Sequence, residues 1–326
     1  MDKSQHDVNH RDCAQSTVRS PFPIAPLPAA PTEGVRLSEE KRNWAWADDR
    51  ENVRVPPEID PSKPSVARVY DFMIGGKDNF AADREVARKM LEIAPEAPYN
   101  GKANRAFLRR AVTYMAREAG IRQFLDIGSG LPTVGNVHEV AHEVDPSIRV
   151  VYVDNDPIVL VHGRAILADN TTTTVIQADV REPESILENP EVRKFIDFRE
   201  PVGLLFVAIL HHLKDEEDPA GLAARFYEVL APGSRVAISH FCNPGDRHPG
   251  ASRLAVESER VFAESLGTGR FRTPEEIQGF FGDLELLEPG LVPPLDWRQD
   301  PETVAGILPP NRDLYYCIYA GVARKN

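Results

Sequence analysis

The stretch 121–135 constrains the fold more than any other part of the chain, because it joins a short apolar run to a glycine-rich turn. The apolar residues of the run are Ile121, Phe124, Leu125 and Ile127. A run of this length predicts a buried parallel strand rather than a helix. Asp126 lies near its end, Gly128 and Gly130 leave the backbone of the next loop open, and Pro132 is placed to start a helix. Strand, loop and helix N-terminus together predict a socket for an anionic or strongly polar group.

The glycine loop alone does not identify a ligand. An ordinary strand–helix turn and a nucleotide site fit these residues equally well. A dinucleotide fingerprint requires a third glycine at position 133, where this chain has Thr133. The spacing therefore argues against a dinucleotide.

Acidic residues follow two further predicted strands. Asp154 ends the run 149–154 and lies about 28 residues after Asp126, near the separation expected for a carboxylate on a ribose diol. Asp156 precedes Pro157 and is expected to cap the next helix. Asp179 follows the predicted strand 173–178, although it could instead cap a helix before Pro183. Because ligands bind at the carboxyl ends of strands in open α/β sheets, we expect these carboxylates to share one site.

Composition narrows the class of protein. The net charge is −12 and no long basic run occurs, which disfavours sequence-independent binding to nucleic acid or to an anionic membrane. The N-terminus has no apolar segment of the secretory type, and no apolar run is long enough to span a bilayer. The cysteines, Cys13, Cys242 and Cys317, lie too far apart for a zinc pattern or a disulfide framework. We therefore expect a reduced, cytoplasmic protein that holds no metal.

Residues 1–57 differ in composition from the rest of the chain. The first 36 residues are polar and then rich in proline, and Trp44 and Trp46 follow. Such a composition cannot form a core, so we expect a disordered extension on a domain that covers residues 58–326. Within that domain, 58–120 is expected to be a helical lead-in and 121–326 the α/β core.

The lead-in contains an unusual break. Residues 64–74 and 81–91 have helical periodicity, and Gly75 begins a polar turn between them. This turn, with Tyr70, Lys77 and Asn79 around it, is either a flexible lid over a site or a plain helix–turn–helix corner.

The remaining pattern alternates strands with helices and ends in a strand pair, which predicts a doubly wound sheet. The expected helices are 102–119, 219–230 and 273–282, and the expected strands are 202–210, 235–241, 284–287 and 314–323. The polar segment 243–272 is interpreted as an insertion at the mouth of the pocket.

Three motifs resemble the class I methyltransferases that use S-adenosylmethionine (SAM): Phe-Leu-Asp126-Ile-Gly128-Ser-Gly130, Val-Val-Tyr-Val-Asp154-Asn-Asp-Pro and Ala-Asp179-Val-Arg. The upstream stretch 67–84 resembles a narrower bacterial family called S-adenosyl methyltransferase, over about residues 58–324. The resemblance implies a Rossmann-like sheet of seven strands, the last antiparallel, with an N-terminal helical lid. Pro132 departs from the broad pattern, in which many class I enzymes have a third glycine.

The resemblance also implies the cofactor and its ligands. Asp126 and the glycine loop would hold the methionine end of SAM, Asp154 the ribose and Asp179 the adenine amine. The complete expected set of cofactor residues is Tyr70, Gly75, Lys77, Asn79, Asp126, Gly128, Ser129, Gly130, Asp154, Asn155, Asp179, Val180 and Ala208.

The expected reaction is methyl transfer to a small molecule, for which a base is needed only if the nucleophile must lose a proton. His212, which follows the fourth strand with His211, is the candidate base, although a structural role fits it equally well. His138 is expected to be structural. Two alternatives stay open: a SAM-binding regulator or scaffold without turnover, and an oxidoreductase linked to NAD. Action on nucleic acid is not expected.

Overall fold

The computed structural model describes residues 59–132, 135–166, 170–299 and 307–326. The chain divides into two units, Met1–Arg54 and Val55–Asn326, and only the second contains described residues. The predicted extension 1–57 therefore lies outside the described residues, as do Trp44 and Trp46.

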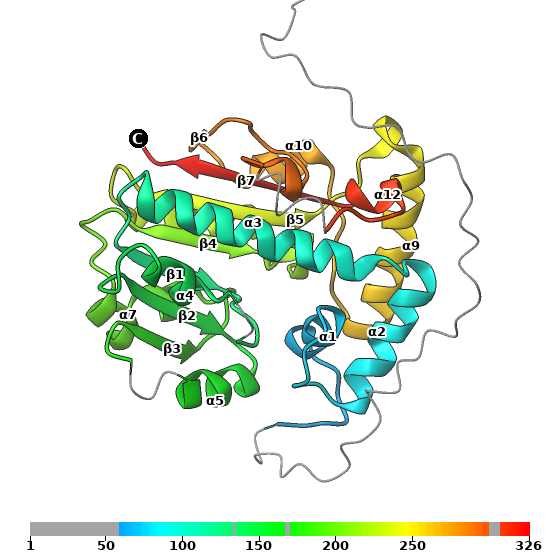
Figure 1. Cartoon of the computed structure of the whole chain (residues 1–326), viewed down its shortest axis with the longest axis horizontal. Helices are drawn as coiled ribbons and strands as arrows, with labels where there is room; N and C mark the ends of the chain where they lie inside the picture. The colour runs from blue at the N-terminus through cyan, green and yellow to red at the C-terminus, as the bar shows by residue number, and fades with distance from the viewer. Residues whose placement is uncertain (1–58, 133–134, 167–169, 300–306) are drawn as a thin grey trace, which may run out of the picture. The chain divides into compact units, whose positions relative to one another are not determined.

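The core is one sheet of seven strands in the order β3-β2-β1-β4-β5-β7-β6 (Figure 1). The strands are β1 Gln123–Ile127, β2 Arg149–Asp154, β3 Thr173–Gln177, β4 Gly203–Val207, β5 Arg235–Phe241, β6 Glu285–Leu286 and β7 Ile318–Arg324. The first five are parallel, and β7 runs antiparallel to β5 and β6. This arrangement confirms the predicted Rossmann-like fold of the class I methyltransferase type.

The strand register places the predicted acids at one edge. Ile127 pairs with Val153, and Asp154 pairs with Gln177, so the carboxyl ends of β1, β2 and β3 are level. The strand order reverses direction between β1 and β4, and such a switch point opens a crevice at the carboxyl ends of the strands.

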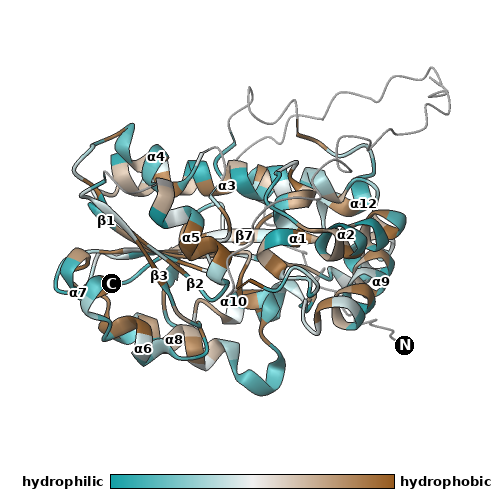
Figure 2. Cartoon of the chain, turned by 90° about the horizontal axis from the view of Figure 1, so that it is seen from below, coloured by the Kyte–Doolittle hydropathy of each residue, from teal (hydrophilic) through white to brown (hydrophobic). Residues whose placement is uncertain are grey.

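Helices cover both faces of the sheet, and their apolar sides face it (Figure 2). On one face, α3 and α4 pack with Phe107, Met115 and Val140; on the other, α6, α7 and α8 pack with Ile186 and Phe226. These helices and α5, which packs on β2 and β3, are α3 Ala97–Arg117, α4 Val137–His142, α5 Pro157–Ile166, α6 Pro183–Leu187, α7 Pro190–Phe195 and α8 Pro219–Val229. Side chains alternate between the faces of a strand, so Asp126 shares the α3 face with Phe124.

A second group of helices lies beyond the carboxyl ends of the strands (Figure 1). This group, here called the helical cap, consists of α1 Val66–Met73, α2 Ala81–Ile93, α9 Pro249–Leu266 and α12 Arg312–Tyr315. Helix α1 packs on α2, α2 on α9, and α9 on α12. The break predicted between residues 74 and 81 separates α1 from α2. The segment 243–272, interpreted from sequence as a polar insertion, contains α9, a helix of 18 residues.

Several boundaries differ from the prediction. Pro132 does not open a helix: α4 begins at Val137 behind the N-cap Asn136, and Glu139 accepts hydrogen bonds from the Gly135 and Asn136 amides at 2.8 and 2.9 Å. This capping box, rather than a proline, sets the start of α4.

Two further predicted elements shift for similar local reasons. The helix expected at 102–119 begins earlier, at Ala97, with Pro98 in its first turn. The strand expected from residue 314 begins at Ile318, because Asn311 caps the short helix α12 instead.

Short helices complete the described fold: η2 Leu210–His212, η3 Asp215–Glu217, η4 Gly245–Arg247, α10 Pro274–Gly279 and η5 Pro294–Asp296. Thr273 caps α10 in the predicted capping box with Glu276. Among the helices of the described ranges, none is long and apolar enough to cross a membrane.

Candidate active site

A cavity of about 450 Å³ lies between the carboxyl edge of the sheet and the helical cap. Its sheet side is lined by the ends of β1 to β4, including Asp126, Asp154, Asp179 and Ala208. Its cap side is lined by α1, α3, α9 and the segment that follows α9. The expected residues Gly128, Ser129, Gly130, Asn155, Val180 and His212 also line it. The structure thus brings most of the predicted site into one cavity.

The glycine loop has the geometry that its sequence predicts. Gly128 has φ 71°, and a Cβ there would lie 2.5 Å from the Ile209 side chain. Gly130 has φ 67°, and no atom of the described residues lies within 4 Å of where its Cβ would be. The hydroxyl of Ser129 between them is buried and has no hydrogen-bond partner among the described residues. The loop therefore approaches the cavity with bare backbone, which a ligand can contact directly.

Two carboxyl groups at the strand ends have raised pKa values because they are buried. Burial raises the pKa of Asp126 to about 7, since the nearby Arg105 only partly offsets the burial and the Asp154 charge adds to it. Burial also raises the pKa of Asp154 to about 6, although the Asp156 and Gly130 amides donate hydrogen bonds to it at 2.9 and 2.8 Å. A cationic or hydrogen-donating ligand would favour the charged forms of both groups.

The third acid is differently placed. The side-chain amide of Asn155 donates a hydrogen bond to the Asp179 carboxylate at 3.0 Å, and the backbone N–H of Arg181 donates another at 2.9 Å. Burial raises the pKa of Asp179, but these hydrogen bonds outweigh it and the pKa is lowered overall. Arg181 also pairs with Glu217 at 2.5 Å, which ties the loop after β3 to η3. Asp179 is therefore a paired, ionised group at the rim of the site, and its bonds are those of a loop rather than of a helix cap.

Helix α1 contributes a cavity wall, but the turn after it does not. Tyr70 lines the cavity and donates a hydrogen bond from its hydroxyl to Gly101 O at 3.3 Å. Gly75, Lys77 and Asn79 are absent from the lining, and Asn79 instead donates to Asp71 at 2.8 Å. The structure does not bring these three expected residues to the cavity, because the turn folds back on α1.

Buried ion pairs stabilise the corner between α1 and α2, here called the α1–α2 corner. Arg68 pairs with Asp83 at 2.9 Å and with Asp156 at 3.7 Å, and all three side chains are buried. Asp83 also accepts hydrogen bonds from the Ser65 and Phe80 amides at 2.9 and 2.8 Å. The charged residues of the stretch 67–84 thus hold α1 against α2 and against the loop after β2.

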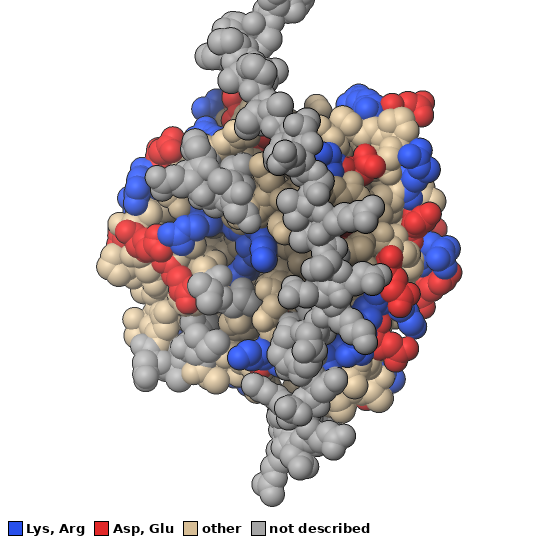
Figure 3. Space-filling model, turned by 45° about the vertical axis from the view of Figure 1, so that its right-hand side comes forward, with Lys and Arg blue, Asp and Glu red and all other residues tan. Residues whose placement is uncertain are grey.

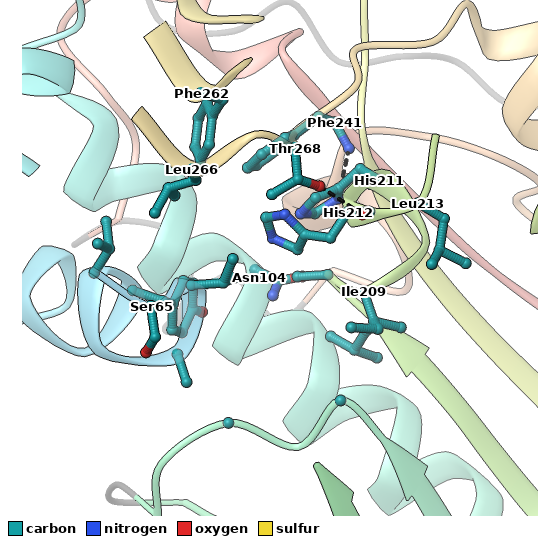
Figure 4. A pocket seen from close by; sticks show the side chains of 18 of the residues that line it. Ser65, Asn104, Ile209, His211, His212, Leu213, Phe241, Phe262, Leu266 and Thr268 are labelled. Atoms are coloured by element: carbon teal, nitrogen blue, oxygen red, sulfur yellow. Dashed lines mark hydrogen bonds between the residues drawn. The ribbon is translucent and has the colours of Figure 1, made fainter. Parts of the chain in front are cut away.

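His211 and His212 lie on η2, directly after β4, and their backbone is held by the chain after α9. Thr268, which lies beside His212 in Figure 4, donates its hydroxyl to His212 O. Arg270 N donates to His211 O at 2.7 Å, and Arg272 donates to Leu213 O at 2.9 Å. Burial, with a smaller effect of Arg181, lowers the pKa of His212 to about 3. The imidazole is therefore neutral near pH 7.

A family comparison fits this geometry. The S-adenosyl methyltransferase family matches residues 52–326. This chain belongs to the S-adenosyl methyltransferase family. The protein is accordingly a methyltransferase, and its cofactor is SAM. The match gives no support to an oxidoreductase or to a scaffold without turnover.

Two solved structures are similar to this methyltransferase along most of its length. One, from Thermobifida fusca and provisionally named a methyltransferase, is 44% identical, with a TM-score of 0.76 over 84% of this chain and 100% of the other. The other, a DUF574 family protein from Streptomyces avermitilis, is 42% identical, with a TM-score of 0.76 over 82% and 99%. No curated protein matches this chain.

Sequence reasoning missed the residues that line the site from α9 and α3. Ser258, Phe262 and Leu266 line the cavity from α9, and Asn104 and Arg105 line it from α3. The spacing of four residues between the three on α9 is a helix-face signal that the sequence does contain. Nothing local, however, indicates that this face meets the glycine loop.

Proposed function

We propose that this methyltransferase transfers the methyl group of SAM to a small-molecule acceptor inside the cavity. The observation that carries the proposal is the continuity of that cavity. One space joins the acidic ends of β1 to β3 to a largely apolar region under the helical cap. Cofactor and acceptor would therefore meet in one enclosed volume of the size that small-molecule sites have.

The sheet side of the cavity fits SAM. Asp126 accepts no hydrogen bond from the described residues, and the ammonium group at the methionine end of SAM would lower its raised pKa by favouring the charged form. We infer that Asp154 takes the ribose diol, which its position in the cavity lining at the end of β2 supports. The loop from Gly128 to Gly130 can approach the ligand with its backbone, and Asp179 lies at the rim for the adenine amine.

SAM supplies an already electrophilic methyl group on a sulfonium, so the protein's main contributions are alignment and exclusion of water. Helix α1 covers the site with the side chains of Val69, Tyr70 and Met73, and α9 covers it with Phe262 and Leu266. His212 is placed on the cap side, where it can contact the acceptor. Burial makes His212 a weak base. We therefore assign it first a hydrogen bond that orients the acceptor, and removal of the acceptor's proton only as the bond to the methyl group forms.

The same geometry disfavours a polymeric acceptor. The cap closes over the carboxyl edge of the strands, and acidic and basic side chains lie next to each other on the face drawn in Figure 3. With a net charge of −12, long-range attraction of nucleic acid is also disfavoured.

The test has two arms. Calorimetry should show SAM binding to the full chain. Incubation with methyl-labelled SAM and an extract of Streptomyces avermitilis, the source of a relative, should then place label in the fraction that passes a small-pore ultrafilter. Label found only in retained protein or nucleic acid would overturn the small-molecule acceptor. Tight binding of SAM with no transfer to any fraction would favour a binding protein without turnover.

A further inference from the structure

We propose that the acceptor is an uncharged aromatic compound with a hydroxyl group, and that this hydroxyl is hydrogen-bonded to the imidazole of His212 and receives the methyl group. The inference rests on the proposed function, because it names the acceptor class of the same cavity. Its evidence comes from the part of the cavity called here the acceptor chamber, which is lined by His211, His212, Phe241, Phe262, Leu266 and Phe271.

Aromatic rings form one wall of the acceptor chamber. Phe241 is stacked against His211, with 3.6 Å between ring centroids, and against Phe271, with 4.7 Å. Phe262 meets Phe241 at 5.1 Å in a tilted arrangement. Gly269 packs so closely on Phe262 that a Cβ there would lie 2.5 Å from it, which holds that ring in place. A fixed wall of rings favours a planar aromatic partner, which can pack edge to face or offset against it.

The acceptor chamber offers no counter-charge. Its titratable side chains are His211 and His212, and burial lowers the pKa of both well below neutrality. The cationic side chains that line the rest of the cavity lie in other settings: Arg181 pairs with Asp179 and Glu217, the charge of Arg105 acts on Asp126, and Lys214 is exposed to solvent. A charged acceptor would therefore lose its hydration without gaining an ion partner, whereas an uncharged one would not.

His212 supplies a polar atom on this apolar surface. The residue is 9% exposed, its ring lines the cavity, and its Nδ1 atom is buried with no hydrogen-bond partner in the described part of the chain. Figure 4 shows the ring extending into the space that Phe262 and Leu266 face. The hydrogen bonds from Thr268, Arg270 and Arg272 to the carbonyls of 211–213 fix its backbone. Because Nδ1 is buried, the hydrogen bond to a ligand falls to Nε2, the other nitrogen of a ring that lines the cavity.

A hydroxyl is the group that best fits this ring. A neutral imidazole carries its hydrogen on either nitrogen, and a hydroxyl can donate to one tautomer and accept from the other. In the transfer, the hydroxyl oxygen forms a bond to the methyl carbon as the carbon–sulfur bond breaks, and the sulfur keeps that electron pair. The hydroxyl proton passes to the unprotonated nitrogen of His212 and then to water. Even a weak base can take it, because the oxygen becomes a strong acid as the new bond forms.

Three naphthalene probes of nearly the same size test the acceptor class. 1-Naphthol is uncharged and has a hydroxyl, 1-methylnaphthalene has none, and 1-naphthoate is charged. Calorimetry on the complex of the protein with S-adenosylhomocysteine should show 1-naphthol binding at least tenfold more tightly than 1-naphthoate and several-fold more tightly than 1-methylnaphthalene. With labelled SAM, mass spectrometry should find 1-methoxynaphthalene. Equal or tighter binding of 1-naphthoate, or no binding of 1-naphthol, would overturn the proposal.

Variants test the role of His212. His212→Gln should lower transfer to 1-naphthol at least tenfold while SAM affinity stays within twofold, whereas His248→Gln, a matched change outside the cavity lining, should alter neither. Should His212→Gln fail to fold, Phe262→Leu removes a ring at similar volume and should weaken 1-naphthol binding several-fold. Unchanged transfer in a folded His212→Gln protein would overturn the assignment. If SAM does not bind at all, the proposed function fails, but 1-naphthol titrated into the free protein still decides the class of ligand.

Discussion

Asp126 at the strand edge and Asp83 at the α1–α2 corner are both buried but differ in their partners. At the corner, Asp83 accepts hydrogen bonds from Ser65 N, Phe80 N and the Arg68 guanidinium at 2.8 to 2.9 Å. At the edge, Asp126 accepts none from the described part of the chain, and burial raises its pKa to about 7. The difference shows that burial alone does not mark a binding residue: a carboxylate satisfied by its own chain holds structure, and one left short of donors is suited to a ligand.

Asp154 lies between these two situations. Gly130 N and Asp156 N donate to it, and each of its oxygens keeps further capacity to accept. Asp156 in turn faces Arg68. The corner therefore reaches the strand edge through one short chain of contacts, from Asp83 through Arg68 and Asp156 to Asp154.

Asp83→Ala should destabilise the fold without a direct effect on the cofactor site. It leaves the buried Arg68 guanidinium without its main partner, and breaking a buried pair in this way costs about 3–5 kcal/mol. Thermal denaturation should show a fall in Tm of roughly 6–20 °C for a domain of this size. Glu85→Ala on the same helix, which removes an exposed carboxylate, should shift the Tm by a degree or two at most. Equal shifts in the two variants would show that the corner is not held by this pair.

Asp154→Ala should have the opposite profile, with SAM binding lost and the fold kept. Removing two charge-assisted hydrogen bonds to a ribose diol, at about 1.5–3 kcal/mol each, weakens binding on the order of a hundredfold or more. Calorimetry measures the affinity, and a Tm close to that of the wild type shows that the variant is folded. Asp78→Ala, at the corner and outside the cavity lining, is the matched control. Affinity within a few-fold of wild type in the Asp154 variant would remove Asp154 from the site.

The raised pKa values make SAM binding depend on pH. In the free protein Asp126 and Asp154 titrate near 7 and 6, both above the usual carboxyl value of 3.8. The free fold thus binds more protons there than the unfolded chain, so these groups reduce stability as pH rises from about 4 to 7. The cationic cofactor requires the charged forms, so its binding releases protons.

We therefore expect SAM affinity to fall about tenfold per pH unit below about 7, and more steeply below 6. Calorimetry between pH 5 and 8 checks the slope, and buffers of different ionisation enthalpy report the released protons. Asp126→Asn should bind SAM more weakly at pH 8 and lose most of the slope between 6 and 7. A flat profile in the wild type would mean that Asp126 does not face the positive end of the cofactor.

The sheet and its carboxyl edge were predictable because their signals are local. Each of the first three strands contains a short run of apolar residues, and Asp126, Asp154 and Asp179 lie at or just after the ends of these strands, which the topology brings together. The break between α1 and α2 was predictable from helical periodicity for the same reason. The start of a helix was less predictable where capping side chains determine it. Asn136 and Glu139 determine the start of α4 in this way.

The residues that line the cavity from α9 were not predictable, because their place in the site depends on contacts between segments that are distant in the sequence. Phe262 belongs to the cavity only because α9 packs on α2 and α12, far from it in the chain. The polar residues near Gly75 suggested a ligand site, yet Asn79 and Asp71 are partners of each other. The sequence of a polar cluster does not show whether its side chains hydrogen-bond to one another or are left to bind a ligand. Only their geometry shows that.

The smallest expected effect is at Lys77, and it tests whether the turn at the α1–α2 corner contributes to cofactor binding. The sequence places Lys77 beside Gly75 in a turn that could close over the cofactor, but the side chain is exposed and outside the cavity lining. Lys77→Ala should therefore change SAM affinity by less than about twofold, since exposed charges away from a ligand contribute little at physiological salt. Hydrogen exchange on residues 66–84, with and without SAM, adds a readout that does not depend on this side chain. Protection on binding should appear in α1, whose Tyr70 and Met73 line the cavity, and be weak in the turn 75–80. A tenfold loss of affinity in Lys77→Ala, together with strong protection of that turn, would show that the corner closes on the bound cofactor and that its carboxylates serve binding as well as structure.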